Sequence, residues 1–268
     1  MSSLRVSNSA NEMVGACARP GSFRPGRYLR QMLATAYFFL VAIMASPIFW
    51  LLHKLAGRRI AMQTGQKMIR KLFRSHIAVM KGLGMLRLEI QGMEGLRDLR
   101  GTIIVSNHPS LFDAVLLIGN LPPSACVMRA DLLRNPAMCG GALLAGYVTN
   151  DSGPAFVRQG IEKIRSGDNL LIFPEGTRTE NPPLNPFKHG FAMVATHSRA
   201  AVQTVLIEYG GTHLAKGVSL FAPADVPLHF RLRVGERFQA LPDETPRAFS
   251  RRMETWFREA LETSEARH

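Results

Sequence analysis

Acidic side chains are missing from a long N-terminal stretch of this 268-residue chain. No Asp or Glu occurs between Glu12 and Glu89, although thirteen basic residues do: Arg19, Arg24, Arg27, Arg30, Lys54, Arg58, Arg59, Lys67, Arg70, Lys71, Arg74, Lys81 and Arg87. Outside this stretch the 20 acidic residues meet an equal number of basic ones, so the formal net charge of +13 belongs to one segment. The rest of the protein is neutral, and we expect no nucleic-acid partner.

Cysteine is also scarce. Cys17, Cys126 and Cys139 form no C-x-x-C pair, and an odd, sparse count fits a reducing compartment. The histidines have no metal-ligand spacing with cysteines or acids, so we expect neither a metal ion nor another cofactor. A G-x-S-x-G motif is absent as well, which argues against a serine hydrolase that would use Ser110 with His108.

Long apolar runs are rare, and the longest extends from Met32 to Leu52 with only Thr35, Ser46 and Pro47 as interruptions. As a helix it is about 30 Å long, close to the thickness of a bilayer's hydrocarbon core. A soluble core helix of this length would normally have a polar face, and a signal sequence would be shorter. We therefore expect a membrane helix, which either spans the bilayer or re-enters after a kink at Pro47.

Basic residues flank both ends of this run, with the larger excess after it. That asymmetry predicts that the chain beyond the run lies at the cytoplasmic face of the plasma (inner) membrane. The following segment, Arg58 to Met80, has apolar residues near helical spacing and basic polar ones, a pattern typical of a helix on an anionic membrane surface. A helix packed on the globular domain with a solvated basic face is the alternative. We accordingly expect membrane-anchoring helices over residues 27–84, after a disordered tail over residues 1–26.

From residue 85 to residue 268 the pattern becomes that of one α/β domain. Short apolar strands are expected at the following places: Leu86–Ile90, Thr102–Val105, Ala125–Arg129, Leu170–Phe173, Val202–Glu208 and Phe230–Val234. Helices are expected between or after them: Ser110–Ile118, Phe156–Ile164 with Asp151 or Ser152 as its cap, Gly190–Ser198, and a last one opened by Thr245-Pro246. This alternation predicts a mixed, largely parallel sheet flanked by helices.

Two polar loops follow two of these strands. The first, Ser106-Asn107-His108-Pro109-Ser110-Leu111-Phe112-Asp113, contains a candidate general base, His108, and a carboxylate that can orient it, Asp113. On one regular helix these residues would diverge, so the pairing requires His108 to lie in the turn before the helix. The second loop, Phe173-Pro174-Glu175-Gly176-Thr177-Arg178, supplies a guanidinium that suits a phosphate. We expect both loops to belong to one active site.

Together these residues resemble the glycerolipid acyltransferases, which include the 1-acylglycerol-3-phosphate acyltransferases. The segment from Asn107 to Asp113 is similar to their H-x4-D motif, and the segment from Phe173 to Arg178 matches their F-P-E-G-T-R motif. Lys188 and Gly190 resemble the F-K-x-G that follows. The resemblance covers residues 85–235, and the two main motifs together are highly specific.

The resemblance implies a reaction. His108, held by Asp113, would deprotonate the hydroxyl of a lysophospholipid-like acceptor such as 1-acylglycerol-3-phosphate. That hydroxyl would attack an acyl thioester on CoA or acyl carrier protein, the latter then being a protein partner, without an acyl-enzyme. The resemblance also implies a set of substrate-binding residues: Glu175, Gly176, Thr177 and Arg178 around the acceptor pocket, with Arg129 and Lys188 as further contacts.

Two departures concern the acceptor. The family's second motif usually ends in Phe-Ile-x-Arg, whereas residues 146–151 contain no arginine, and the fourth motif usually has a proline that residues 201–206 lack. An acyltransferase for a non-glycerophosphate acceptor therefore stays open, as does a basic membrane-binding adaptor without activity.

Overall fold

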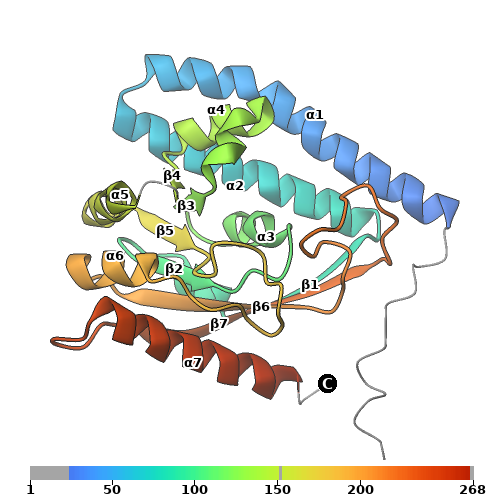
Figure 1. The fold of residues 1–268 in the computed structure, drawn as a ribbon. Helices are drawn as coiled ribbons and strands as arrows, with labels where there is room; N and C mark the ends of the chain where they lie inside the picture. Colours follow the sequence, from blue (N-terminus) through green and yellow to red (C-terminus); the bar gives the residue numbers. More distant parts are fainter. Residues whose placement is uncertain (1–23, 151–152, 266–268) are drawn as a thin grey trace, which may run out of the picture.

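The computed structural model describes residues 24–150 and 153–265. Its centre is a seven-stranded sheet with the order β1-β7-β6-β2-β5-β3-β4 (Figure 1). The strands are β1 (Leu86–Gln91), β2 (Ile103–Ser106), β3 (Ser124–Met128), β4 (Val148–Thr149), β5 (Asn169–Ile172), β6 (Val202–Tyr209) and β7 (Leu228–Phe238). Neighbouring strands are parallel except for β6 and β7. The mixed, largely parallel sheet is confirmed.

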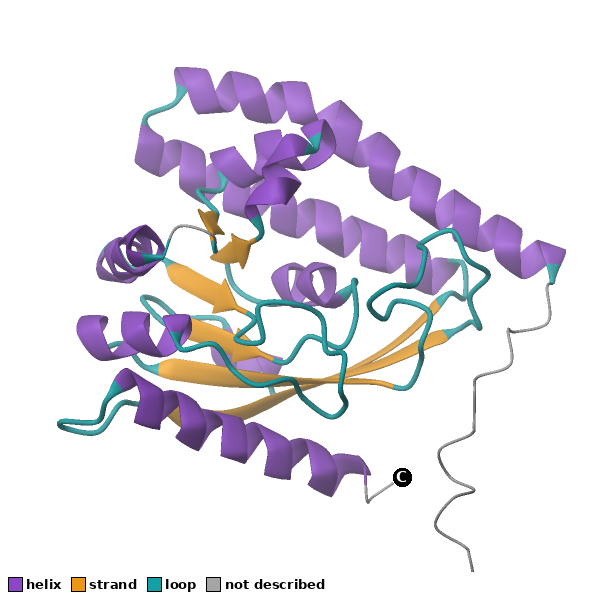
Figure 2. Cartoon of the chain, in the orientation of Figure 1, coloured by secondary structure: helices purple, strands orange, loops and turns teal. Residues whose placement is uncertain are grey.

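Helices cover both faces of this sheet (Figures 1 and 2). On one face lie α1 (Pro25–Leu55), α2 (Arg58–Gly82), α3 (Asp113–Asn120) and α4 (Pro136–Leu144); on the other lie α5 (Pro154–Arg165), α6 (Gly190–Ser198) and α7 (Pro246–Glu265). Alternate residues of β2 point to opposite faces of the sheet. Ile104 packs in the hydrophobic core beneath α3, whereas Ile103 and Val105 pack in the core shared with α6 and α7.

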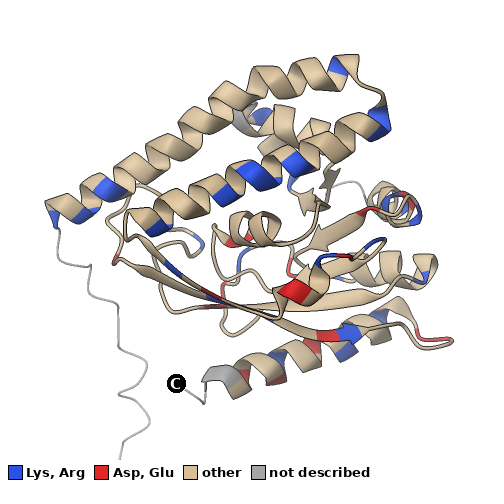
Figure 3. Ribbon diagram, turned by 180° about the vertical axis from the view of Figure 1, so that it is seen from behind, with Lys and Arg blue, Asp and Glu red and all other residues tan. Residues whose placement is uncertain are grey.

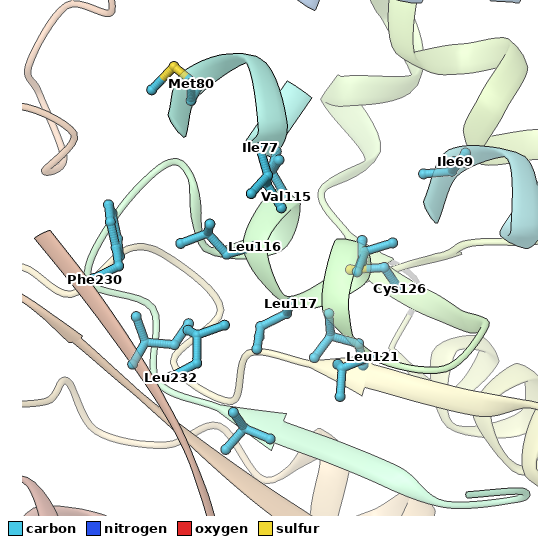
Figure 4. Close-up of a cluster of buried hydrophobic side chains, with 14 of the residues drawn as sticks. Ile69, Ile77, Met80, Val115, Leu116, Leu117, Leu121, Cys126, Phe230 and Leu232 are labelled. Carbon is cyan, nitrogen blue, oxygen red and sulfur yellow. The ribbon is translucent and has the colours of Figure 1, made fainter. Parts of the chain in front are cut away.

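Helix α3 is the link between the sheet and the N-terminal helices. Its Leu116 and Leu117 are fully buried over the strands, and Val115 lies beside Ile77 of α2 (Figure 4). The two helices come close because Gly119 lacks a side chain: a Cβ there would lie 2.8 Å from Ile77 Cδ1. The hairpin of α1 and α2 is therefore packed on the domain that carries the polar loops.

Helix α1 is longer than the predicted run and includes Pro47. Its most apolar window has a mean hydropathy of 2.0, and only 17% of that window is buried. One side packs against α2 and α4, with Phe49 buried between them, whereas the other side exposes apolar residues: Leu33, Leu40, Ile43, Met44, Ile48 and Leu51. By length and composition α1 can cross a membrane.

The structure adjusts some predicted boundaries and adds elements that were not predicted. Of the expected tail, residues 1–23 lie outside the described part, and α1 already begins at Pro25. The helix expected from Ser110 begins at Asp113, and the proposed caps Asp151 and Ser152 also lie outside the described residues. Two short 3-10 turns, Met93–Leu96 and Ala130–Arg134, and the elements α4 and β4 were not predicted.

Candidate active site

The loop after β2 brings His108 and Asp113 together as the pairing requires. His108 Nδ1 lies 2.7 Å from Asp113 Oδ2. Because a carboxylate only accepts, Nδ1 carries the hydrogen, and the lone pair of the imidazole is on Nε2. Asp113 is fully buried as the first residue of α3, where the helix dipole favours a negative charge.

Ser110 fixes the carboxylate from the other side. Its backbone N–H donates to Asp113 Oδ2 at 2.7 Å, and its hydroxyl donates to Asp113 Oδ1. Ser110 is itself fully buried. A hydroxyl that is committed to Asp113 and closed to solvent does not serve as a nucleophile, so the geometry opposes the serine hydrolase alternative.

Contacts with the end of β5 and with the backbone of β6 hold the rest of this loop. Phe173, directly after β5, stacks on the His108 ring with centroids 4.1 Å apart. Asn107 continues the pairing with β6, since its amide donates to Ile207 O and accepts from Ile207 N, both at 2.8 Å. These contacts fix the imidazole in position. Neither Phe173 nor Asn107 was predicted to do so, although Phe173 stands at the end of an apolar run.

Glu175 is buried, and its carboxylate holds neighbouring loops by hydrogen bonds. Only 2% of it is accessible, and its carboxylate accepts from the backbone N–H of His108 at 2.8 Å and of Asn185 at 3.0 Å. The Thr179 hydroxyl donates to it as well. Burial raises the pKa of Glu175, and these hydrogen bonds oppose the shift. Glu175 thus joins the two polar loops and shapes the pocket without lining it.

A cleft of about 910 Å³ opens beside the loops, and six of the expected residues line it: His108, Arg129, Gly176, Thr177, Arg178 and Lys188. Asp113 and Glu175 stand behind this lining. Gly176 has a φ of +70° and touches Lys188, whose Nζ would lie 2.8 Å from a Cβ. A larger residue there is therefore strained by the backbone, and the flexible Lys188 side chain would have to move aside.

The two expected phosphate contacts already have protein partners. Arg178 Nη1 donates to the carbonyl oxygens of Leu214 at 3.1 Å and Ala215 at 2.9 Å, which anchors the loop after β6. Arg129 forms two bonds with Asp131, at 3.1 and 2.8 Å, and both side chains are mostly exposed. A ligand phosphate would bind the remaining Arg178 nitrogens or displace Asp131.

Comparison with known proteins gives a consistent picture. Residues 87–208 match the model of the family described as Acyltransferase. A 1-acyl-sn-glycerol-3-phosphate acyltransferase of Limnanthes alba is 32% identical over 53% of this chain and 51% of its own length. A lyso-ornithine lipid O-acyltransferase of Pseudomonas aeruginosa is 36% identical over 39% of this chain and 42% of its own length. The chain thus spans about half the length of these curated relatives.

The fold is shared with a solved structure. The crystal structure of the 1-acyl-sn-glycerophosphate (LPA) acyltransferase, PlsC, from Thermotoga maritima covers 90% of this chain and 99% of its own, with a TM-score of 0.69 and 23% identity. At that identity the likeness concerns the architecture: a largely parallel sheet flanked by helices, with an apolar N-terminal helix.

Proposed function

We propose that this chain is a membrane-associated O-acyltransferase of the glycerolipid acyltransferase superfamily, because residues 87–208 match the Acyltransferase family model and the relatives named above are acyltransferases. It moves a fatty acyl group from a thioester of CoA or acyl carrier protein to the hydroxyl of a lysophospholipid-like acceptor, such as 1-acylglycerol-3-phosphate. The observation that carries the proposal is the His108–Asp113 pair at 2.7 Å, with the imidazole in the wall of a cleft of about 910 Å³.

The proposed reaction uses this geometry. His108 Nε2 takes the proton of the acceptor hydroxyl as its oxygen attacks the thioester carbonyl carbon. The carbon–sulfur bond then breaks, and the imidazolium returns the proton to the leaving thiolate. Asp113 holds the ring and stabilises its charged form throughout. Since Ser110 is committed to Asp113, the acyl group passes directly between substrates.

The test is transfer by purified protein in mixed micelles. Labelled acyl-CoA and acyl carrier protein thioester are each offered with 1-acylglycerol-3-phosphate and other lysolipids. We expect label in a diacyl product with at least one combination. Release of free fatty acid alone would point to a hydrolase, and the absence of any reaction in a folded protein would leave the adaptor alternative.

A second acceptor class has its own support. Arg178 and Arg129 are both bonded within the protein, and residues 146–151 lack the family's arginine. The cleft is lined by charges of both signs, because Asp131 and Lys216 line it with Lys188. A zwitterionic lysolipid, such as the acceptor named for the Pseudomonas relative, suits such a lining. Comparing initial rates on lyso-ornithine lipid and 1-acylglycerol-3-phosphate decides between the two classes.

The membrane partner is proposed from the N-terminal hairpin. The outward side of α1 is apolar, and α2 exposes basic residues along its length (Figure 3), among them Lys67, Lys71 and Arg74. Apolar residues insert into lipid, and basic ones attract an anionic surface. The enzyme would thus work at the cytoplasmic face of the plasma (inner) membrane, where its lipid acceptor lies.

A further inference from the structure

A second, smaller cavity lies between α1, α2 and α4. Its volume is about 90 Å³, and most of its lining is apolar, with Phe38, Phe49, Leu72 and Phe73 among the contributors. That is enough space for a short piece of alkyl chain or a few water molecules. Two side chains in this lining do not fit an apolar cavity, namely His76 and Tyr147.

His76, in α2, is 6% exposed, and its Nδ1 has no hydrogen-bond partner among the described residues. Aromatic rings surround it: Tyr37 is stacked on it, and the edges of Phe38 and Phe112 meet it at centroid distances of 5.1 and 5.4 Å. Burial lowers the pKa of His76 to about 4, so the imidazole is neutral at physiological pH. A neutral imidazole offers one donor nitrogen and one acceptor nitrogen.

Tyr147 lies before β4, and its hydroxyl is also buried without a partner among the described residues. Burial raises its pKa well above the usual value, so the phenol keeps its proton and can donate. Buried polar groups are satisfied in almost all native structures, and two orphans in one cavity indicate a missing hydrogen-bonding occupant.

The cavity adjoins the proposed catalytic cleft. Met128, at the end of β3, lines both spaces. Phe112, which touches the His76 ring, directly precedes Asp113. A chain attached to a group reacting at His108 would therefore have to displace only the flexible Met128 side chain to enter the cavity.

We propose that this cavity binds a stretch of substrate alkyl chain that carries a hydroxyl group, held by His76 and Tyr147. The inference rests on the proposed function. On an alkyl chain, a hydroxyl is the smallest substituent that can pair with both groups: its oxygen accepts from the Tyr147 phenol, and its hydrogen is donated to a His76 nitrogen. A plain chain would leave both polar atoms unpaired, and sites built to bind a substrate hydroxyl discriminate strongly against analogues that lack it. The chain belongs either to the thioester donor or to the acceptor.

The experiment has one arm for each source. In the first, thioesters with a plain chain and with a hydroxyl at successive carbons compete for one plain acceptor. In the second, a plain thioester acylates lysolipids whose own chain is plain or hydroxylated. We expect at least one hydroxylated substrate to exceed its plain counterpart by about tenfold or more in kcat/KM, in one arm.

Variants assign that preference to the two side chains. His76→Phe and Tyr147→Phe keep a ring in the cavity but remove its polar atom, and each should reduce the ratio of hydroxylated to plain turnover by about tenfold. Tyr37→Phe is the matched control, because it removes a hydroxyl of the same cavity that already bonds to Ser75. It should leave the ratio as it is.

The outcomes separate this inference from the function on which it rests. No transfer from any donor to any acceptor would overturn the proposed function. Transfer at equal rates with plain and hydroxylated chains in both arms would overturn the inference alone, and would leave water as the occupant of the cavity. A preference that survives both Phe variants would also overturn it, because the selection would then lie elsewhere.

Discussion

At the scale of single residues, the imidazole of His108 has the most direct consequence. His108→Ala should reduce transfer by a factor of about 10² to 10⁴, the usual effect of losing a general base. Asp113→Asn should also lower kcat, because the amide no longer fixes the Nδ1–H tautomer at 2.7 Å. Initial rates of transfer, with circular dichroism as the control for folding, check both. Near-full activity in a folded His108→Ala protein would refute the mechanism.

Glu175 illustrates a residue whose effect is indirect. Glu175→Ala would remove the acceptor of two backbone N–H groups and one hydroxyl, and an unpaired buried donor costs about 1–3 kcal/mol. We expect a lower free energy of unfolding in urea together with a lower kcat, because the His108 loop loses its anchor. Glu180→Ala is the matched control in the same loop, since that side chain is half exposed and its partner is the similarly exposed Lys216. Equal stability of the two variants would contradict the anchoring role.

Arg178 combines two roles that kinetics can separate. Arg178→Ala should raise the acceptor KM while sparing the thioester KM, if its free nitrogens hold the acceptor headgroup. Arg178→Lys should rescue this incompletely, because an ammonium lacks the planar pair of donors. Both variants also lose bonds to Leu214 and Ala215, so their Tm is measured in parallel. A higher KM for the thioester alone would place Arg178 on the donor side.

At the scale of elements, the contact between α2 and α4 depends on Gly65. A Cβ at this position would lie 2.8 Å from backbone atoms of Leu144 and Ala145, which cannot rotate away. Gly65→Ala should therefore destabilise the protein by about 1–3 kcal/mol despite the better helix propensity of alanine. Gly82→Ala, at the end of the same helix, meets nothing within 4 Å and should be neutral or stabilising. Thermal unfolding in detergent distinguishes these expectations.

The helices and strands that could be predicted from the sequence are those with a strong hydrophobic pattern. Buried strands such as β2 and β5 are continuous apolar runs, and α7 has a clear apolar face, so their places could be predicted. Helix α4 could not, because its sequence is apolar without periodicity and contains Gly140 and Gly141. Those glycines let α1 approach, as a Cβ on Gly140 would lie 3.2 Å from Ser46 O. That is a tertiary reason, invisible to local pattern.

The candidate site also has a part that could be predicted from the sequence and a part that could not. His108, Asp113 and the second loop could be named because the motif fixes residue types and spacing. The hydrogen bonds of Arg129 with Asp131 and of Ser110 with Asp113 could not be predicted from the sequence, since they depend on the backbone path of each loop. The start of α3 shows the difference: it moves from Ser110 to Asp113 because the intervening residues turn to bring His108 back onto the carboxylate.

At the scale of the whole molecule, α1 is not an independent anchor. The buried side chain of Gln31 donates to the carbonyl oxygens of Leu220 at 3.1 Å and Ala222 at 2.7 Å, and accepts from the Ala224 N–H at 3.0 Å. These bonds join the start of α1 to the loop that Arg178 also holds. The hairpin therefore keeps a fixed position relative to the cleft, and a membrane that binds the hairpin presents its lipids to the active site in a constant orientation.

This arrangement predicts two separable contributions to membrane binding. We expect the apolar side of α1 to insert, and salt does not weaken insertion, so the full-length protein should stay on membranes through a high-salt wash and leave only with detergent. The basic side of α2 adds a charge-dependent part. Replacing Lys67, Lys71 and Arg74 by Gln should weaken binding to anionic vesicles by about 3 kcal/mol at low salt, at roughly 1 kcal/mol per residue, and should not change binding to neutral vesicles. Replacing Arg237, Arg247 and Arg251, which are exposed on β7 and α7, removes the same charge away from the hairpin and should have little effect. Quantitative release of the unaltered protein by salt would show that α1 does not enter the bilayer, and equal losses in the two triple variants would show that net charge, rather than the face of α2, attracts the protein to lipid.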